Sequence, residues 1–424
     1  MIRRLALTAL GAALGVAALT AGPARAEIDL ISPETLSGMV DLRLALADGE
    51  TSWTRKGYGK ARFGGDRDGG PRAHAELAEA AVQWRPRVDW AWSGVFTAQF
   101  QPGQEHEVDI VEAYVAYKPV PTSPVRFSGR AGLFWPHISQ EHGDPFWGTS
   151  YSITPSAINS WIGEEIKVMG AEASVSAPVG GSTVSASAGL FGYNDTAGTL
   201  LALRGWALHD LKSAAFSTYP LPRLDPPHVG IWRGQDPFTE PTRHDIDDRI
   251  GFYGRVEWRT PYPLSLNLFY YDNAGNPAKV ESMQWAWDTR YWNLGAAYDL
   301  GQNTRILSQV MWGETLEGKP TPQGIWIDVG FRSAYLLATH SFGHDRVTAR
   351  MDYFQTRDRT WQARDNNNEE GWAATLAWRR DLTEKASLLA EVMRIDSNRL
   401  ARAYQSVAAD QAQTVVQTSL RLKF

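Results

Sequence analysis

Apolar and polar residues alternate along many short segments of this chain, and this pattern restricts the fold more than any other feature. One segment places Leu42, Leu44 and Leu46 on one face and Asp41 and Arg43 on the other. Such an alternation puts one face of a strand in an apolar medium and the other in a polar one. Sixteen segments are predicted to be strands in this way: 38–47, 73–84, 90–100, 109–118, 125–133, 165–176, 183–193, 250–259, 264–271, 291–299, 304–312, 327–339, 346–354, 371–379, 386–395 and 414–424.

The connections between these segments alternate strictly between short turns and longer loops. An up-and-down antiparallel barrel in a membrane has this asymmetry, with short turns at one rim and long loops at the other, and usually an even number of strands. A soluble sandwich has no reason to sort its connections so regularly. The predicted fold class is therefore all-β: a transmembrane antiparallel up-and-down β-barrel of about 16 strands.

Composition excludes several other classes of protein. The chain has 424 residues, 21% of them charged, and lacks the repeated long apolar runs that a bundle of membrane helices needs. It contains no cysteine, so disulfides, cysteine-ligated zinc and thiol nucleophiles are excluded. The net charge is −5 and the basic residues are dispersed, so no nucleic-acid partner is expected.

The first 26 residues have the pattern of a secretory signal peptide. Arg3 and Arg4 precede an apolar stretch, and Ala24-Arg25-Ala26 provides a cleavage site. A retained membrane anchor is the alternative interpretation. The predicted organisation is a signal peptide over 1–26 and a single transmembrane barrel over 27–424.

Aromatic residues and the last strand support the placement in a membrane. Tryptophan gathers where hydrocarbon meets the lipid headgroups. The following residues lie near predicted strand ends on the apolar register: Trp90, Trp92, Trp258, Trp292, Trp312, Trp372 and Trp378. In the last strand, Leu420, Leu422 and Phe424 alternate with polar residues. This strand resembles the C-terminal strand of bacterial outer-membrane proteins, and the resemblance implies that the barrel assembly machinery reads it as a signal.

The inner face decides what a barrel of this size does, because sixteen strands leave an aqueous channel. The predicted inward residues include more basic than acidic side chains, with Arg332 and Asp328 among them. This excess predicts a mild preference for anions, although ion pairs that only brace the wall remain an alternative. The principal pore-lining candidates are Arg43, Glu112, Arg126, Arg130, Arg255, Glu257, Arg350 and Asp352.

The third long connection, 134–164, is the candidate constriction. Its segments GRAGLFWP and TPSAINSWIGEE resemble porin-like proteins of Gram-negative bacteria, including those called phosphate-selective porins. In the sixteen-strand porin superfamily the third external loop commonly folds into the channel, and the family assembles as a homotrimer. The resemblance therefore implies a constriction in which acidic and histidine side chains of this loop face Arg126 and Arg130. The constriction candidates are His137, Glu141, His142 and Asp144.

The longest connection, 194–249, is predicted to be an external loop that covers the pore mouth or contacts a neighbouring subunit. It includes a short amphipathic helix near Leu200–Leu211.

Enzymatic and metal-binding functions are disfavoured. His137, Glu141 and His142 approach an inverted zinc spacing, but Pro136 and Gly143 flank them and no helix is evident. No hydrolase, nucleotide or dinucleotide motif follows a suitable strand. The sequence thus predicts a passive porin in the lipid bilayer of the bacterial outer membrane, without cofactor, catalytic residue or metal, that passes small hydrophilic solutes. A sugar- or oligosaccharide-specific channel and a non-conducting surface adhesin or envelope anchor are the alternatives.

Overall fold

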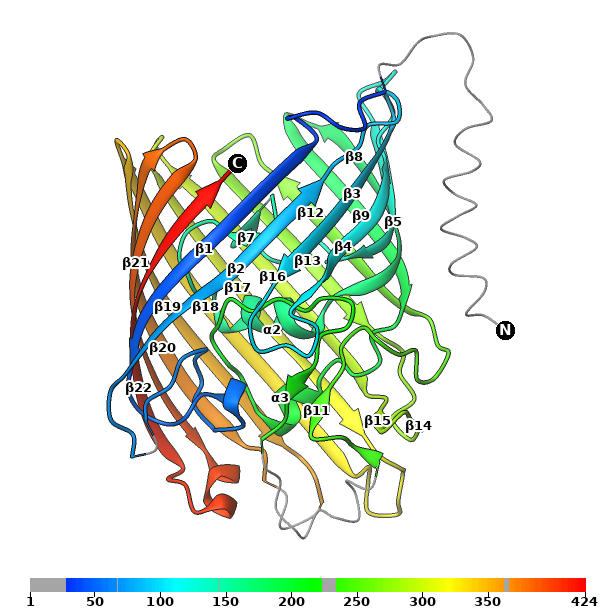
Figure 1. Cartoon of the computed structure of the whole chain (residues 1–424). Helices are drawn as coiled ribbons and strands as arrows, with labels where there is room; N and C mark the ends of the chain where they lie inside the picture. Colours follow the sequence, from blue (N-terminus) through cyan, green and yellow to red (C-terminus); the bar gives the residue numbers. More distant parts are fainter. Residues whose placement is uncertain (1–27, 67, 144, 223–233, 362–365) are drawn as a thin grey trace.

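Sixteen antiparallel strands close into one barrel (Figure 1). The structure is a computed structural model that describes residues 28–66, 68–143, 145–222, 234–361 and 366–424. The predicted signal peptide lies outside these residues. The barrel strands are β1 (Leu36–Ala47), β2 (Arg72–Trp84), β3 (Trp92–Phe100), β4 (Val108–Tyr117), β5 (Arg126–Phe134), β8 (Val168–Val179), β9 (Ser182–Gly192), β12 (Gly251–Arg259), β13 (Leu264–Asp272), β16 (Asp288–Leu300), β17 (Thr304–Glu317), β18 (Ile327–Phe342), β19 (Asp345–Asp358), β20 (Glu369–Thr383), β21 (Ala386–Arg399) and β22 (Asp410–Lys423).

Every predicted strand is present, so the predicted fold class is confirmed. Each barrel strand pairs with the next one along the chain, and β22 returns to pair with β1. The short turns, such as the one between β18 and β19, gather at one rim of the barrel, and the long connections gather at the other (Figure 1). We call these the short-turn rim and the long-loop rim. No helix in the described ranges is long and apolar enough to cross a lipid bilayer.

The outer face of the wall is apolar, as the alternation predicts. Leu44, Leu336 and Met351 are more than half exposed although the chain has a large buried interior. Trp292 and Trp312 are directly paired on neighbouring strands near the long-loop rim, and both are exposed. Exposed leucine, methionine and tryptophan over the whole outer wall are typical of a surface that contacts lipid.

The last strand closes the ring against the first. Leu422 pairs with Val40, and Leu420 pairs with Leu42, so both leucines lie on the outer face. The backbone N–H of Gly38 donates to the carbonyl of Phe424 over 2.8 Å, and the N–H of Phe424 donates back over 3.1 Å. The exposed ring of Phe424 covers Gly38, where any side chain would collide with it. The glycine therefore allows the terminal aromatic ring to lie flat on the seam.

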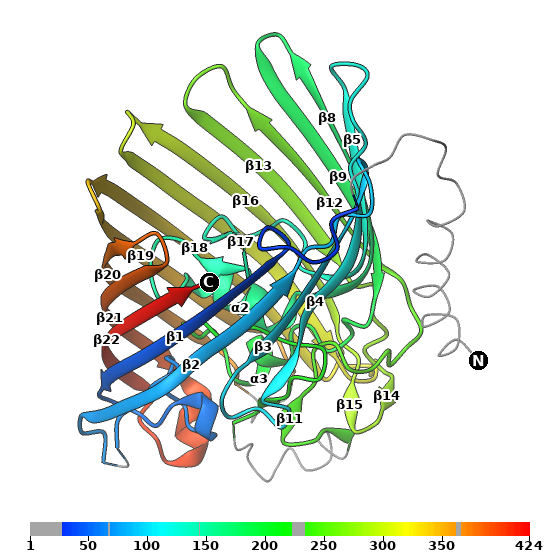
Figure 2. The ribbon, with the colours of Figure 1, turned by 45° about the horizontal axis from the view of Figure 1, so that its top comes forward.

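The barrel is not empty, because three connections from the long-loop rim fold into it. We call the described residues within 48–71, 134–167 and 193–222 the inner loops. The second contains α2 (Ala157–Glu165) and the third contains α3 (Thr199–Leu203), and both helices are enclosed by the wall in two views (Figures 1 and 2). Helix α2 begins where the Ser156 hydroxyl accepts the backbone N–H of Asn159, and every residue of the helix is buried.

The smaller elements also belong to the connections between barrel strands. Two short 3-10 turns lie at Trp53–Arg55 and Leu400–Gln405. Three two-stranded ribbons complete the described structure: β6 (His142–Gly143) with β7 (Gly148–Thr149), β10 (Tyr219–Pro220) with β11 (Phe238–Thr239), and β14 (Val280–Glu281) with β15 (Gln284–Trp285).

Three predictions are corrected by this architecture. The connection 194–249 was predicted to lie outside the barrel, yet its first part is an inner loop, with Leu200, Leu201 and Trp206 fully buried. Its predicted helix is also shorter, because Gly205 adopts φ = +81° and ends the helical path. In β18, Asp328 and Arg332 lie on the outer face rather than the inner one. The inner, buried face is formed by Val329, Phe331 and every second residue after them.

Candidate functional site

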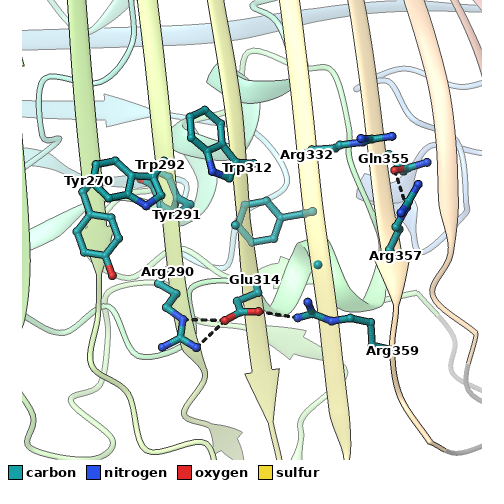
Figure 3. A pocket seen from close by; sticks show the side chains of 13 residues that line it. Tyr270, Arg290, Tyr291, Trp292, Trp312, Glu314, Arg332, Gln355, Arg357 and Arg359 are labelled. Carbon is teal, nitrogen blue, oxygen red and sulfur yellow. Dashed lines mark hydrogen bonds and ion pairs between the residues drawn. The ribbon is translucent and has the colours of Figure 1, made fainter.

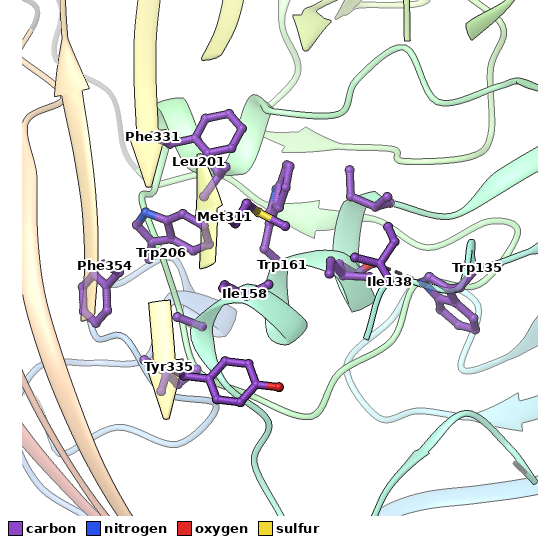
Figure 4. Close-up of a cluster of buried hydrophobic side chains, with 14 of the residues drawn as sticks. Trp135, Ile138, Ile158, Trp161, Leu201, Trp206, Met311, Phe331, Tyr335 and Phe354 are labelled. Carbon is purple, nitrogen blue, oxygen red and sulfur yellow. Dashed lines mark hydrogen bonds between the residues drawn. The ribbon is translucent and has the colours of Figure 1, made fainter. Parts of the chain in front are cut away.

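The candidate site is the lumen, and its shape depends on how the inner loops dock. Four aromatic side chains form the centre of an apolar cluster inside the barrel (Figure 4). Trp161 of α2 lies 5.3 Å from the rings of both Tyr291 and Phe331 on the wall, and 6.1 Å from Trp206 of the third inner loop. All four are buried. The second and third inner loops therefore share one core with the wall of β16–β19, and the same cluster extends to Phe191 and Tyr253 on β9 and β12.

Arg350 on β19 is the main polar anchor of the second inner loop. Its Nε donates to Asp352 over 2.7 Å, and its Nη1 lies 3.1 Å from Glu141. The same guanidinium donates to the carbonyls of Thr154 and Pro155 over 2.7 and 3.0 Å. Hence Arg350 satisfies two acids and two loop carbonyls at once, in a place that water does not reach.

The two acids in turn receive the start of α2. A carboxylate oxygen of Asp352 accepts the backbone N–H of Ala157 over 3.1 Å. Glu141 accepts the backbone N–H of Ser156 over 3.0 Å. Negative charge near the first turn of a helix is favourable because of the unpaired N–H groups there. The loop is thus positioned by charge at the N-terminus of its own helix.

A second anchor joins the third inner loop to the opposite wall. Asp210 lies 2.9 Å from Arg43 on β1 and 2.9 Å from Arg62 of the first inner loop. Arg62 also contacts Glu76 on β2 over 2.6 Å, and Arg43 contacts Asp41 over 2.8 Å. Burial alone would raise the pKa of Asp210, but the two arginines hold it well below its usual range. Asp210 is therefore ionised and connects two loops to the wall.

The two inner loops are also tied directly to each other. Arg204 donates two hydrogen bonds to Glu164 of α2, over 2.5 and 2.7 Å, and His209 lies 2.8 Å from the same carboxylate. Burial favours a raised pKa for Glu164, yet Arg204 and His209 lower it to about 2. Because this acid stays charged, the loops remain linked over the physiological pH range.

The inner wall of β5, β8, β9 and β12 is polar and less covered in its short-turn half, whereas Phe134, Phe191 and Tyr253 at its long-loop end belong to the apolar cluster. Cross-strand neighbours run from Ser128 on β5 through Ser174 and Ser187 to Arg255 on β12. All four are partly accessible. Small hydroxyl side chains leave space above the wall, so the structure keeps an open, hydrophilic strip along β5, β8, β9 and β12.

The charged residues of this strip are only partly neutralised. Arg130 lies 3.0 Å from Glu172, and Arg255 lies 2.5 Å from Glu257. Arg126 is exposed and has no ion pair within the described part of the chain. The strip thus carries at least one unbalanced positive charge.

A group of three acids has the spacing of metal ligands but already serves another purpose. Carboxylate oxygens of Asp195, Asp245 and Asp247 lie within 4.8 Å of one another. Asp195 accepts the backbone N–H groups of Ile246 and Asp247, over 2.5 and 3.4 Å. The cluster therefore caps a turn, and we assign no metal to it.

Comparison with known proteins identifies the fold. Neither a protein-family model nor a curated protein matches the sequence. Solved structures do match over almost the whole chain. The anion-selective porin from Comamonas acidovorans is 15% identical, with a TM-score of 0.53. The alignment spans 92% of this chain and 99% of that porin. The chain has the fold of bacterial outer-membrane porins.

Two further structures support the same assignment of fold. The outer membrane channel DcaP of Acinetobacter baumannii is 11% identical, with a TM-score of 0.52, and covers 93% of this chain and 99% of its own. A loop L8 deletion mutant of OmpT, an outer membrane protein of Vibrio cholerae, is 12% identical, with a TM-score of 0.50 and coverage of 92% and 99%.

Within this porin fold, the predicted pore-lining residues fall into two groups. All eight side chains point inward. Four of them lie beneath the inner loops and are buried: Arg43, Glu112, Arg350 and Asp352. The other four lie on the strip in the short-turn half of the lumen: Arg126, Arg255 and Glu257 are at least partly accessible, and Arg130 is mostly buried and donates to the Trp135 carbonyl of the second inner loop.

The predicted constriction residues also differ in their surroundings. Glu141 is buried against Arg350, not beside Arg126 or Arg130 as the resemblance implied. His142 stacks on Trp147 with ring centroids 3.6 Å apart, and His137 is exposed. Asp144 lies outside the described residues. Loop 134–164 thus enters the porin barrel, but its acid is used for anchoring.

The surroundings of Glu165 lead us to expect that the inner loops pack more tightly in mild acid. Its carboxylate accepts N–H groups of Trp161, Gly198 and Leu200 over 2.6–3.1 Å, yet burial dominates and raises its pKa to about 7 from an ordinary value of 4.5. Because the docked state disfavours the charged form of Glu165, the free energy of docking is least favourable above pH 7, where the carboxylate is ionised. This unfavourable contribution disappears below about pH 4.5, where the acid is protonated in both states. Lowering the pH between these values is expected to stabilise loop docking by roughly 3 kcal/mol.

Hydrogen exchange of the protein in detergent tests this pH dependence. After correction for the intrinsic exchange rate at each pH, amides of residues 196–206 are expected to be more strongly protected at pH 5 than at pH 8. Glu165→Gln removes the titration and flattens the dependence, whereas Glu281→Gln in an exposed turn at the same rim preserves it. Burial also raises the pKa of Asp195 to about 7. Asp195 accepts hydrogen bonds from residues 246 and 247, so its titration affects exchange in peptides other than 196–206. An equal pH dependence in Glu165→Gln and wild type would contradict the assignment.

Proposed function

We propose that this protein is a passive channel of the bacterial outer membrane that admits small hydrophilic solutes. The observation that carries the proposal is the partly accessible polar strip in the short-turn half of β5, β8, β9 and β12, inside a closed barrel with an apolar exterior. An apolar exterior matches lipid, and a polar interior of this width holds water. The inner loops occupy the long-loop half of the lumen and contact the wall on several sides, so they narrow the channel above this strip.

Charge on the strip supports a mild preference for anions. Arg126 has no acidic partner among the described residues. Arg130 pairs with Glu172, and Arg255 pairs with Glu257. In water a unit charge about 8 Å from a permeating ion contributes roughly 0.5 kcal/mol, which changes the local ion concentration about twofold. Salt screens such charges, so selectivity is expected to be strongest at low ionic strength.

The double variant Arg126→Ala, Arg130→Ala tests the anion preference. It removes two positive charges and leaves Glu172 without its partner at 3.0 Å, so the strip loses its excess of positive charge, with Arg255 and Arg259 balanced by Glu172 and Glu257. The reversal potential in a KCl gradient is expected to move toward cation preference, with a permeability ratio changed at least about fourfold in dilute salt. Arg380→Ala, on the outer face of β20, is the matched control. An unchanged reversal potential in the double variant rejects the role of this strip.

A sugar-specific channel is the second candidate. Trp147 lies between Trp135 and His142, with centroid distances of 4.2 and 3.6 Å, so both faces of its ring are covered and only its partly accessible edge is open to a sugar. Saturable block of the ion current by oligosaccharides, relieved by Trp147→Ala, would favour this candidate over a general pore. Complete absence of current in planar bilayers would instead favour a non-conducting adhesin or envelope anchor.

We also propose a homotrimer and recognition of the last strand by the barrel assembly machinery. The outward side chains Leu420, Leu422 and Phe424 support the second proposal, because a membrane-facing edge is accessible to an assembly factor before the ring closes. Phe424→Ala is expected to lower the amount of assembled protein in the outer membrane severalfold. A mass of one chain by light scattering in mild detergent would reject the trimer.

A further inference from the structure

The outer wall carries an unusual group of arginines next to the aromatic residues of the long-loop rim (Figure 3). One row of directly paired residues crosses four strands: Arg290, Glu314, Gly330 and Arg357. All belong to the outer face, which carries Trp292 and Trp312 in the neighbouring row toward the membrane. These residues therefore lie where hydrocarbon gives way to lipid headgroups.

The row contains a depression of about 520 Å³. Its aromatic border is Tyr270, Trp292 and Trp312, and its polar border includes Arg332, Arg357 and Arg359. Gly330 forms part of the floor, where the nearest atoms to an added Cβ would be those of the Arg359 guanidinium at 3.7 Å. Because residue 330 has no side chain, the guanidinium groups border an open space instead of a filled wall.

Two of the arginines lack an acidic partner within the described residues. Arg359 is held by Glu314 and Asp328, over 2.7 and 2.5 Å, and Arg290 shares Glu314. In contrast, Arg357 donates to the neutral amide of Gln355 over 3.1 Å. Arg332 lies over the ring of Tyr353 at 5.9 Å.

The excess positive charge is located on one side of the depression. The carboxylates of Asp272 and Asp288 attract Arg290 electrostatically. Glu370 accepts a hydrogen bond from the hydroxyl of Tyr353. The region of Arg332, Arg357 and Arg359 is left with more guanidinium than carboxylate groups. An exposed arginine at the edge of hydrocarbon is costly unless an anion accompanies it.

We infer that this depression binds the phosphate group of a phosphorylated lipid of the outer leaflet. Guanidinium groups bind phosphate oxygens through paired, charge-assisted hydrogen bonds. The phosphate lies between Arg332, Arg357 and Arg359, and the adjoining rings of Trp312 and Trp292 contact the part of the lipid just below it. A lipid is favoured over a soluble ion because the aromatic border continues directly into the lipid-facing wall.

Native mass spectrometry of the full chain in dodecyl maltoside tests this inference without any measurement of current. The probes are a phosphatidic acid, whose headgroup is a phosphate monoester, and a phosphatidylcholine with the same acyl chains. Wild type is expected to retain one phosphatidic acid with at least about tenfold higher affinity than phosphatidylcholine, and Arg332→Gln, Arg357→Gln is expected to abolish this preference. Both side chains are exposed and free of buried ion pairs, so the barrel should assemble, and the single variant Arg357→Gln should show an intermediate loss.

The controls separate the source of the phosphate and the position of the site. Arg380→Gln removes an outward arginine at the short-turn rim, paired with Asp345 at 3.6 Å, and should leave the preference unchanged. Millimolar inorganic phosphate should not displace the lipid. Equal lipid binding by the double variant and wild type overturns the inference, and so does displacement by inorganic phosphate, which would indicate a site for the free ion. Capture of an acidic protein in place of lipid would likewise overturn it.

Discussion

Arg350→Ala is expected to release the second inner loop from the wall and to raise single-channel conductance severalfold. The variant leaves Glu141 and Asp352 buried without their partner and removes the donors to two loop carbonyls. Breaking a buried ion pair by removing one member costs about 3–5 kcal/mol. Because this region holds the start of α2, the loop should leave the wall before the barrel itself unfolds. Planar-bilayer conductance and thermal unfolding in detergent measure the two effects.

Arg346→Ala is the matched control for this prediction. Arg346 lies four residues before Arg350 on the same inner face of β19, and it donates to the Ser150 carbonyl of the same loop over 3.0 Å. Losing this partly exposed bond should cost only about 1 kcal/mol and leave conductance nearly unchanged. Should Arg350→Ala fail to assemble, Glu141→Gln tests the same anchor with a smaller disturbance. Wild-type conductance and stability in both Arg350→Ala and Glu141→Gln would reject the anchor.

Trp161→Ala is expected to loosen both large inner loops together. The indole fills the space between Tyr291, Phe331 and Trp206, and its Nε1 donates to Glu165 over 2.6 Å. Replacing a buried tryptophan by alanine costs about 3–5 kcal/mol because a cavity remains. Since α2 and the segment around Trp206 share this core, hydrogen exchange should accelerate in residues 157–165 and 199–206 by similar factors.

Trp292→Ala provides the comparison, because this tryptophan neighbours Tyr291 in sequence but faces away from the lumen. It should leave exchange in both inner loops at wild-type rates. If Trp161→Ala accelerated exchange in α2 alone, the two loops would not form a single cooperative unit. If it accelerated neither, the packing between the cluster and the wall would contribute nothing to loop docking.

The number, order and approximate limits of the strands were predictable because each wall residue experiences one of two media. In β1 the difference is clean: Leu42, Leu44 and Leu46 face outward, and Asp41 and Arg43 face inward. Local alternation then specifies both the strand and its orientation. The regular change between short and long connections needed no tertiary information either.

The orientation of β18 could not be predicted, and the reason is physical. Val329, Phe331, Tyr335 and Leu337 line the inner face because the apolar cluster packs on them. Where the interior of a barrel is filled with protein, the inner face is as apolar as the outer one. Polarity then no longer distinguishes the two faces, so Arg332 was assigned to the wrong one.

The ion pairs that anchor the inner loops could not be predicted from the sequence for a different reason. Arg350 and Glu141 are 209 residues apart in the chain, and Asp210 and Arg43 are 167 residues apart. Neither pair has a spacing that a local pattern detects. Arg350 and Arg43 were recognised as inward residues, but whether an inward charge meets water or a loop depends on where distant segments fold. Asp210, Arg62 and Arg204 had no sequence signal at all.

The pairing of β1 with β22 affects how the barrel assembles in the membrane. Residues 39–47 pair with 415–423, so the strands that meet there are made at opposite times during synthesis. A chain that stopped before β22 would expose the backbone amides of β1 and β21, and hydrocarbon offers them no partner. Partial insertion is therefore not a resting state, and the bilayer itself discriminates between finished and truncated molecules.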